Sequence, residues 1–138
     1  MNPQFVGGRA RLSIHQPSTM SYTPNYEHYT ILIDALKSLR AKRLTRGSIY
    51  DARQDCPCAL GAIVMHRYPE AEDFPSEDLL DSYESKMQRE GYLGDAAYSI
   101  IEENDDYEGT PEERYEHMLW WAEEIVEAFS PITTNHKS

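Results

Sequence analysis

Two cysteines separated by one proline, Cys56-Pro57-Cys58, offer the most specific chemistry in the sequence. They stand where a helix is expected to start, and there the helix dipole would stabilise a thiolate. Redox motifs, however, place two residues between their cysteines, and a zinc site needs two further ligands that no second cysteine pair supplies. We therefore predict two small buried residues and expect no catalytic residue, metal or cofactor. A thiol or metal enzyme that uses Cys56, Cys58 and His66 remains an alternative.

The acidic run 102–109 has some of the composition of a calcium loop. If Gly109 takes the obligatory glycine position of an EF-hand, Asn104 becomes the first ligand and Tyr115 the twelfth. The twelfth ligand must be a bidentate carboxylate, so the alignment fails at its most discriminating position. The run therefore predicts a solvated acidic turn before a helix.

His117 lies close in sequence to two tryptophans, Trp120 and Trp121. On a helix, Trp121 shares a face with His117, whereas Trp120 leans toward Glu116 and Glu123. We expect one indole in the core and the other at its rim, where a tryptophan beside carboxylates can anchor a partner protein. No nucleophile with its base, no phosphate loop and no pair of helical histidines accompanies them, so we predict that the protein is not an enzyme.

The charge of the chain is divided between its halves. The net charge is −11, but residues 1–69 carry nine Lys/Arg and four Asp/Glu, whereas residues 70–138 carry four Lys/Arg and twenty Asp/Glu. An acidic half of this kind repels nucleic acid and anionic lipid and attracts basic protein surfaces. No apolar run reaches the roughly 20 residues that span a bilayer, and no secretory signal is recognisable. We expect an intracellular protein, in a bacterial or host cytoplasm.

Helical periodicity and capping residues predict an all-α fold, a single compact domain of about five helices around a buried central helix. The central helix is expected over 58–68, where the side chains are apolar on every side and Gly61 would allow a close helix–helix crossing. The other helices are expected from Thr23-Pro24, from a Ser76 cap to Glu90, over 94–103, and from the capping box Thr110-Pro111-Glu112-Glu113. The helical domain should span residues 23–130, with a flexible arm at 1–22, a frayed tail at 131–138 and an acidic loop at 69–75.

Three short stretches resemble one family of small helical domains from bacteria and their phages. The stretches are the connection Arg46-Gly47-Ser48-Ile49-Tyr50-Asp51, the helix Cys58-Ala59-Leu60-Gly61-Ala62, and the pair Asn104-Asp105 before the Thr110 cap. The resemblance covers roughly residues 29–127. It implies a helical fold and a bacterial or phage source, and it implies no activity.

These observations favour a non-enzymatic acidic module that binds a basic surface of another protein, without contacting nucleic acid or a membrane itself. A phage-encoded inhibitor of a host defence or regulatory protein would use such a face against a nucleic-acid-binding cleft. The alternative is an assembly protein whose basic 37–53 region meets the acidic 70–127 region of another copy. The expected partner-binding residues all lie in the acidic half: Glu102, Glu103, Asp105, Asp106, Glu108, Glu112, Glu116, Trp120, Glu123, Glu124 and Glu127.

Overall fold

The computed structural model describes residues 24–130, which form six helices and one pair of short strands. In chain order these are α2 (Tyr26–Ser38), β1 (Tyr50–Asp51), β2 (Cys56–Pro57), α3 (Ala59–Arg67), α4 (Glu70–Asp73), α5 (Glu77–Arg89), α6 (Ala96–Asp106) and α7 (Pro111–Phe129). The strands pair antiparallel, with Tyr50 opposite Pro57. The described chain is therefore mostly helical, as predicted, with one tiny two-stranded sheet added. The predicted arm at 1–22 and tail at 131–138 lie outside the described residues.

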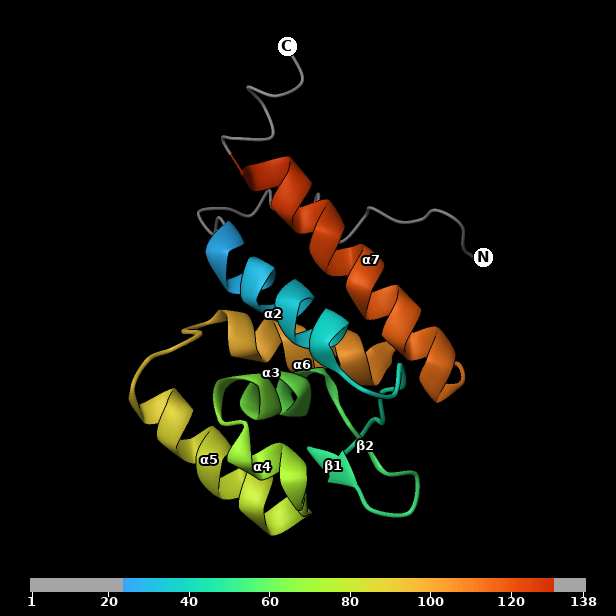
Figure 1. The fold of residues 1–138 in the computed structure, drawn as a ribbon. Helices are drawn as coiled ribbons and strands as arrows, with labels where there is room; N and C mark the ends of the chain where they lie inside the picture. Colours follow the sequence, from blue (N-terminus) through green and yellow to red (C-terminus); the bar gives the residue numbers. More distant parts are fainter. Residues whose placement is uncertain (1–23, 131–138) are drawn as a thin grey trace.

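The helices are arranged in two groups with α3 between them (Figure 1). On one side α2 packs against α7, and α6 lies next to them; on the other side lie α4 and α5. α3 contacts α2, α4, α5 and α6. Every residue from Ala59 to Met65 is buried, as their unbroken apolar character predicts.

Capping residues explain where most of the helices begin. The predicted box at the start of α7 is present: the Thr110 hydroxyl accepts a hydrogen bond from the Glu113 amide, and the Glu113 carboxylate accepts one from the Thr110 amide. Ser76 caps α5 as expected. α2, however, begins later than predicted, because Asn25 is the residue whose side chain accepts from the Glu27 amide, at 3.0 Å. The segment predicted as an acidic loop also contains one helical turn, α4, which buries Ala71.

Gly61 lies close to Ile49, just before β1, and to Pro57 of β2, and its three nearest neighbouring atoms belong to these two residues and not to another helix. A Cβ atom at Gly61 would overlap the carbonyl oxygen of Ile49 and would lie 2.9 Å from Cβ of Pro57. The same Ile49 carbonyl accepts a hydrogen bond from the Cys58 amide, at 3.1 Å. The expected helix–helix crossing is therefore wrong, and the missing side chain instead lets the β1 and β2 segments lie against the start of α3.

Candidate functional site

The two cysteines lie directly before α3. Cys58 is the N-cap residue, and its Sγ accepts a hydrogen bond from the Gly61 amide at 3.4 Å. Burial raises the pKa of the Cys58 thiol to about 11, and burial also raises that of Cys56. Both cysteines are buried, as predicted, and the thiolate-stabilising effect of the helix dipole is outweighed. His66 lies near the other end of α3, about 12 Å along the helix axis, so it cannot act as a base for Cys58.

Asn104 points into the protein, so the calcium-loop alignment has no structural counterpart. It lies in the last turns of α6 and is fully buried. Its Oδ1 accepts from the Ala59 amide, and its Nδ2 donates to the Thr45 carbonyl, both at 3.0 Å. The prediction of a solvated acidic turn is therefore wrong at this position. Within residues 24–130, no group of three or more His, Cys, Asp or Glu side chains is placed to hold a metal ion.

Arg114 is a second buried polar residue that the sequence analysis did not single out. It is only 3% exposed, and its guanidinium donates to four backbone carbonyls: those of Asn104 (3.1 Å), Leu44 (3.1 Å), Tyr107 (2.9 Å) and Gly109 (3.4 Å). Burial, and then repulsion by Arg46, lowers the pKa of Arg114, while the charge of Asp105 opposes this shift. Arg114 shares a helical face with Met118 and Trp121, and this spacing is the signal that could have indicated its burial.

Asn104, Asp105 and Arg114 form one polar junction, a name used below for these three residues. The junction joins the connection after α2 to α6 and to the start of α7, because Asp105 Oδ1 accepts from the Gly47 amide at 3.1 Å and from Nδ2 of Asn104 at 2.9 Å. The stretches that carry the family resemblance thus meet at this point. The contacts of Gly47, Ala59, Asn104 and Asp105 at this point are accounted for by folding, since they are made within the chain.

The two tryptophans occupy different environments. Trp121 is buried and packs edge-to-face on Tyr29, with ring centroids 5.5 Å apart. Trp120 is 38% exposed, which confirms that one indole packs in the core and the other lies at its rim. The ring of His117 contacts that of Trp120, with 5.7 Å between centroids, so the exposed indole is the one beside the histidine.

His117 joins α7 to the end of α6. Its ring stacks on Tyr107 with centroids 4.4 Å apart and an angle of 16° between the planes. Its Nε2 lies 2.7 Å from Oε2 of Glu103. Trp120 thus lies against His117 at an angle of 44° between the rings, and His117 in turn stacks on Tyr107, the residue that follows α6.

The structure divides the predicted partner-binding residues into three sets. Asp105 belongs to the polar junction, and Glu103 is partly buried against His117. Glu124 is also partly buried. The remaining residues are exposed, some at the end of α6 and some along one side of α7; they are Glu102, Asp106, Glu108, Glu112, Glu116, Trp120, Glu123 and Glu127. We call five exposed residues on one side of α7 the α7 stripe; they are Glu112, Glu116, Trp120, Glu123 and Glu127.

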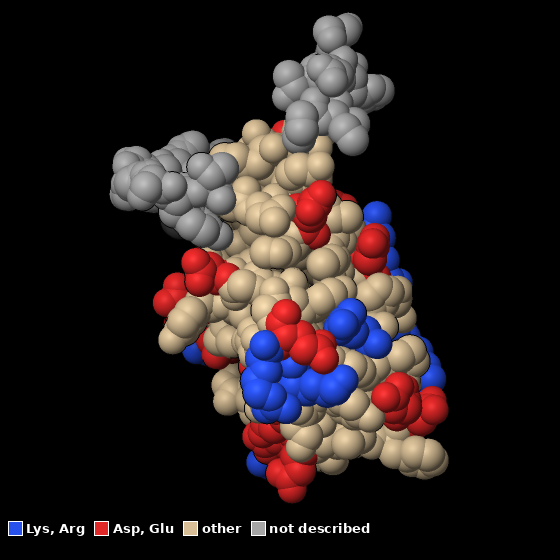
Figure 2. Space-filling view, turned by 90° about the vertical axis from the view of Figure 1, so that its left-hand side faces the viewer, with Lys and Arg blue, Asp and Glu red and all other residues tan. Residues whose placement is uncertain are grey.

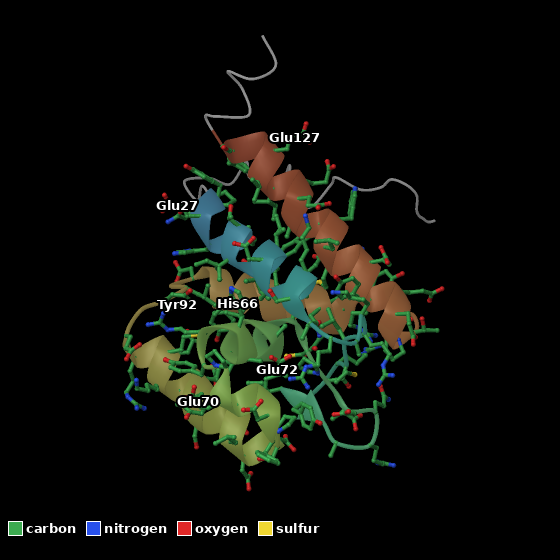
Figure 3. The ribbon with its side chains drawn as sticks, viewed as in Figure 1. Glu27, His66, Glu70, Glu72, Tyr92 and Glu127 are labelled. Atoms are coloured by element: carbon green, nitrogen blue, oxygen red, sulfur yellow. The ribbon has the colours of Figure 1, made fainter. Side chains whose placement is uncertain are left out.

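Lysine and arginine side chains on another face of the protein have acidic neighbours. Figure 2 shows a group of them with carboxylates directly beside it, on the side of the molecule to which α5 belongs. Between α3 and α5, Arg67 and Lys86 each lie 3.4 Å from a Glu90 oxygen, and the Arg67 guanidinium lies over the ring of Tyr92 at 4.1 Å from its centroid. Figure 3 shows Tyr92 beside the middle of the molecule and Glu127 far from it, at the upper end of α7.

Comparisons with known proteins add nothing to these contacts. No protein-family model matches the chain, and neither a curated protein nor a solved structure matches it. Among residues 24–130, no helix combines the length and the apolar character that a membrane span requires.

Proposed function

We propose that the protein is a non-enzymatic binding module whose α6–α7 face occupies a basic surface of another protein, of the kind that binds nucleic acid. The family resemblance extends the proposal to a phage-encoded inhibitor that acts in the cytoplasm of a bacterial host. A single helical domain with α3 at its centre is part of the same proposal. The α7 stripe would be the part of this domain that contacts the partner.

The charge density along α7 supports this proposal. Six glutamates lie between positions 112 and 127. This interval is about 22 Å of helix, so α7 carries roughly one negative charge per 4 Å. One strand of B-DNA carries one charge per about 3.4 Å of helix axis. A cleft that accepts a nucleic acid backbone would therefore meet a similar density of charge on α7.

The single observation that carries the proposal is that three glutamates of the stripe are not neutralised by any described residue. Glu112, Glu116 and Glu123 form no ion pair with any described residue, whereas Arg40, Arg67 and Lys86 all pair with carboxylates of other elements or of their own helix. Like charges four residues apart, as in Glu112 and Glu116, destabilise a helix by roughly 0.2–0.5 kcal/mol per pair. A partner that supplies positive charge would remove this cost on binding.

Trp120 gives the stripe an apolar centre. Exposed aromatic residues surrounded by polar groups are frequent anchors of protein–protein contacts, and their truncation costs about 2 kcal/mol or more of binding. Trp120→Ala should therefore weaken binding strongly while leaving the melting temperature almost unchanged. A large loss of stability would instead mean that the indole is needed for the fold.

The test is capture of proteins from a bacterial lysate on the immobilised protein at rising salt, with the captured proteins identified and competed by duplex DNA. Captured nucleic-acid-binding proteins should be released by salt and by DNA. The double variant Glu116→Lys with Glu123→Lys should lose them. The matched control, Asp34→Lys with Asp81→Lys, changes the net charge equally at exposed positions of α2 and α5 and should retain them. Equal capture by both variants, or no capture at low salt, would overturn the proposal.

Assembly of copies is a second candidate function, favoured by the basic segment after α2. Lys37, Arg46 and Arg53 are exposed and form no ion pair with a described residue. The basic 37–53 region and the acidic 70–127 region do meet within one copy, where Arg40 Nε lies 3.8 Å from Glu72 Oε2. Light scattering at low and high salt distinguishes the functions: assembly predicts a mass that falls with salt, and the proposed binding module predicts a constant one.

A further inference from the structure

We propose that Trp120 and the carboxylates around it bind one arginine side chain of the partner. This inference rests on the proposed function and names the chemical group that the α7 stripe recognises. The argument depends on how the indole is held, on the charges within its reach, and on an equivalent arrangement elsewhere in this protein.

The indole of Trp120 is held in place before any partner arrives. The ring of His117, one helical turn earlier, lies against it at an angle of 44°, and Tyr107 stacks on His117. The contact between His117 Nε2 and Glu103 fixes the imidazole to α6. Because the ring is already positioned, a ligand that stacks on it pays little for ordering a side chain.

Carboxylates lie one helical turn from Trp120 in both directions. Glu116 precedes it by four residues, and Glu123 and Glu124 follow it by three and four. Residues at these spacings are neighbours on a helix, with about 5–6 Å between their Cβ atoms. A cation that rests on the indole can therefore pair with a carboxylate at the same time. No lysine or arginine of residues 24–130 lies over this ring.

Arginine fits this site better than lysine. A guanidinium is planar, so it can stack on the indole and still direct its N–H groups sideways at two carboxylate oxygens. An ammonium is more strongly hydrated and cannot stack. On these grounds a peptide rich in arginine should bind more tightly than a lysine peptide of equal length and charge.

The protein itself contains the proposed arrangement at another place. The guanidinium of Arg67 lies over the Tyr92 ring, 4.1 Å from its centroid, and its Nη2 is 3.4 Å from Oε1 of Glu90. The side chains of Arg67 and Glu90 are 36% and 43% exposed, so the combination forms at a hydrated surface. Trp120 offers the same two partners, a ring and carboxylates, with the cation to come from the partner protein.

The experiment compares two peptides of equal length and charge, one with arginine and one with lysine at alternating positions, by calorimetry at low salt. The arginine peptide should bind the full chain about three to five times more tightly, as expected for one cation–π contact at an exposed site. Trp120→Leu retains an apolar side chain and should abolish this preference without weakening the lysine peptide. Glu116→Gln with Glu123→Gln should weaken both peptides.

Each outcome decides between the two proposals. Equal affinity of the wild-type protein for both peptides, or a preference that survives in Trp120→Leu, would overturn the arginine site and leave the proposed function standing. Binding of neither peptide at low salt would overturn the proposed function as well. If Trp120→Leu fails to fold, Trp120→Phe is used in its place. The phenyl ring binds cations more weakly than the indole, so the preference for the arginine peptide should be smaller than in the wild-type protein. An unchanged preference would contradict the inference.

Discussion

Replacing Gly61 with alanine should destabilise the protein, although the same change stabilises an ordinary exposed helix. Helix propensity alone favours alanine by about 1 kcal/mol. In this structure, however, the new Cβ would overlap the Ile49 carbonyl oxygen and lie 2.9 Å from Cβ of Pro57. The overlapping atom belongs to the backbone, so no rotation of a side chain can relieve the contact.

The expected size of the effect follows from three contributions. Overpacking in a well-packed core costs roughly 1–3 kcal/mol. If the Ile49 segment moves away, the hydrogen bond from the Cys58 amide to the Ile49 carbonyl is lost as well, at about 0.5–1.5 kcal/mol. After subtraction of the gain in propensity, Gly61→Ala should lower the free energy of unfolding by about 2 kcal/mol. For a domain of this size the melting temperature should fall by about 8 °C.

Urea and thermal unfolding followed by circular dichroism measure this difference. The control is the pair Ser85→Gly and Ser85→Ala, at an exposed position within α5, where alanine should be more stable than glycine by about 1 kcal/mol. In the control pair, the melting temperature should rise from the glycine variant to the alanine variant. If Gly61→Ala also raises the melting temperature, the placement of α3 against the Ile49 and Pro57 segments is refuted.

Two further predictions concern the polar junction and the cap of α3. Arg114→Lys keeps a positive charge, but its single ammonium group cannot reach the carbonyls of separate segments. Urea unfolding should therefore show a free energy of unfolding that is lower by about 2–4 kcal/mol. The control Arg89→Lys, at an exposed position of α5, should change it little. Because the native pKa of Cys58 is raised, stability should be complete below about pH 9.0, the ordinary thiol value, and decrease as the pH rises toward about 11. Cys58→Ser replaces the capping sulfur with a hydroxyl oxygen and removes this titration, so an equally steep loss of stability in that variant would contradict the assignment.

The sequence could predict the helices because their signals are local. The capping box at Thr110 and the Ser76 cap each involve residues three positions apart, and the structure has both. The short α4 was missed because a single turn with one buried alanine has no measurable periodicity. The start of α2 was misplaced because two potential caps, Thr23 and Asn25, stand close together.

The polar junction could not be predicted in the same way. Asn104 bonds to Ala59, 45 positions earlier, and Arg114 to Leu44, 70 positions earlier. No local pattern encodes which distant segment will supply a hydrogen-bond partner. The acidic residues around Asn104 instead predicted a solvent-exposed side chain. Asp105 was predicted as a binding residue for the same reason, although its carboxylate accepts two hydrogen bonds from within the chain. The exposure of Trp120, by contrast, follows from the helical phase of α7 alone.

The junction also has a consequence for the charge of the α6–α7 face. Arg114 is the only lysine or arginine in α6 and α7, and its guanidinium donates to backbone carbonyls instead of pairing with the glutamates of α7. Lys86, in α5, is paired with Glu90. The guanidinium of Arg114 is thus used to hold segments together, and no described lysine or arginine pairs with Glu112, Glu116 or Glu123. A fold that needed these glutamates only for solubility would lose nothing if a cation stood among them, whereas a face that binds a basic partner requires that none does.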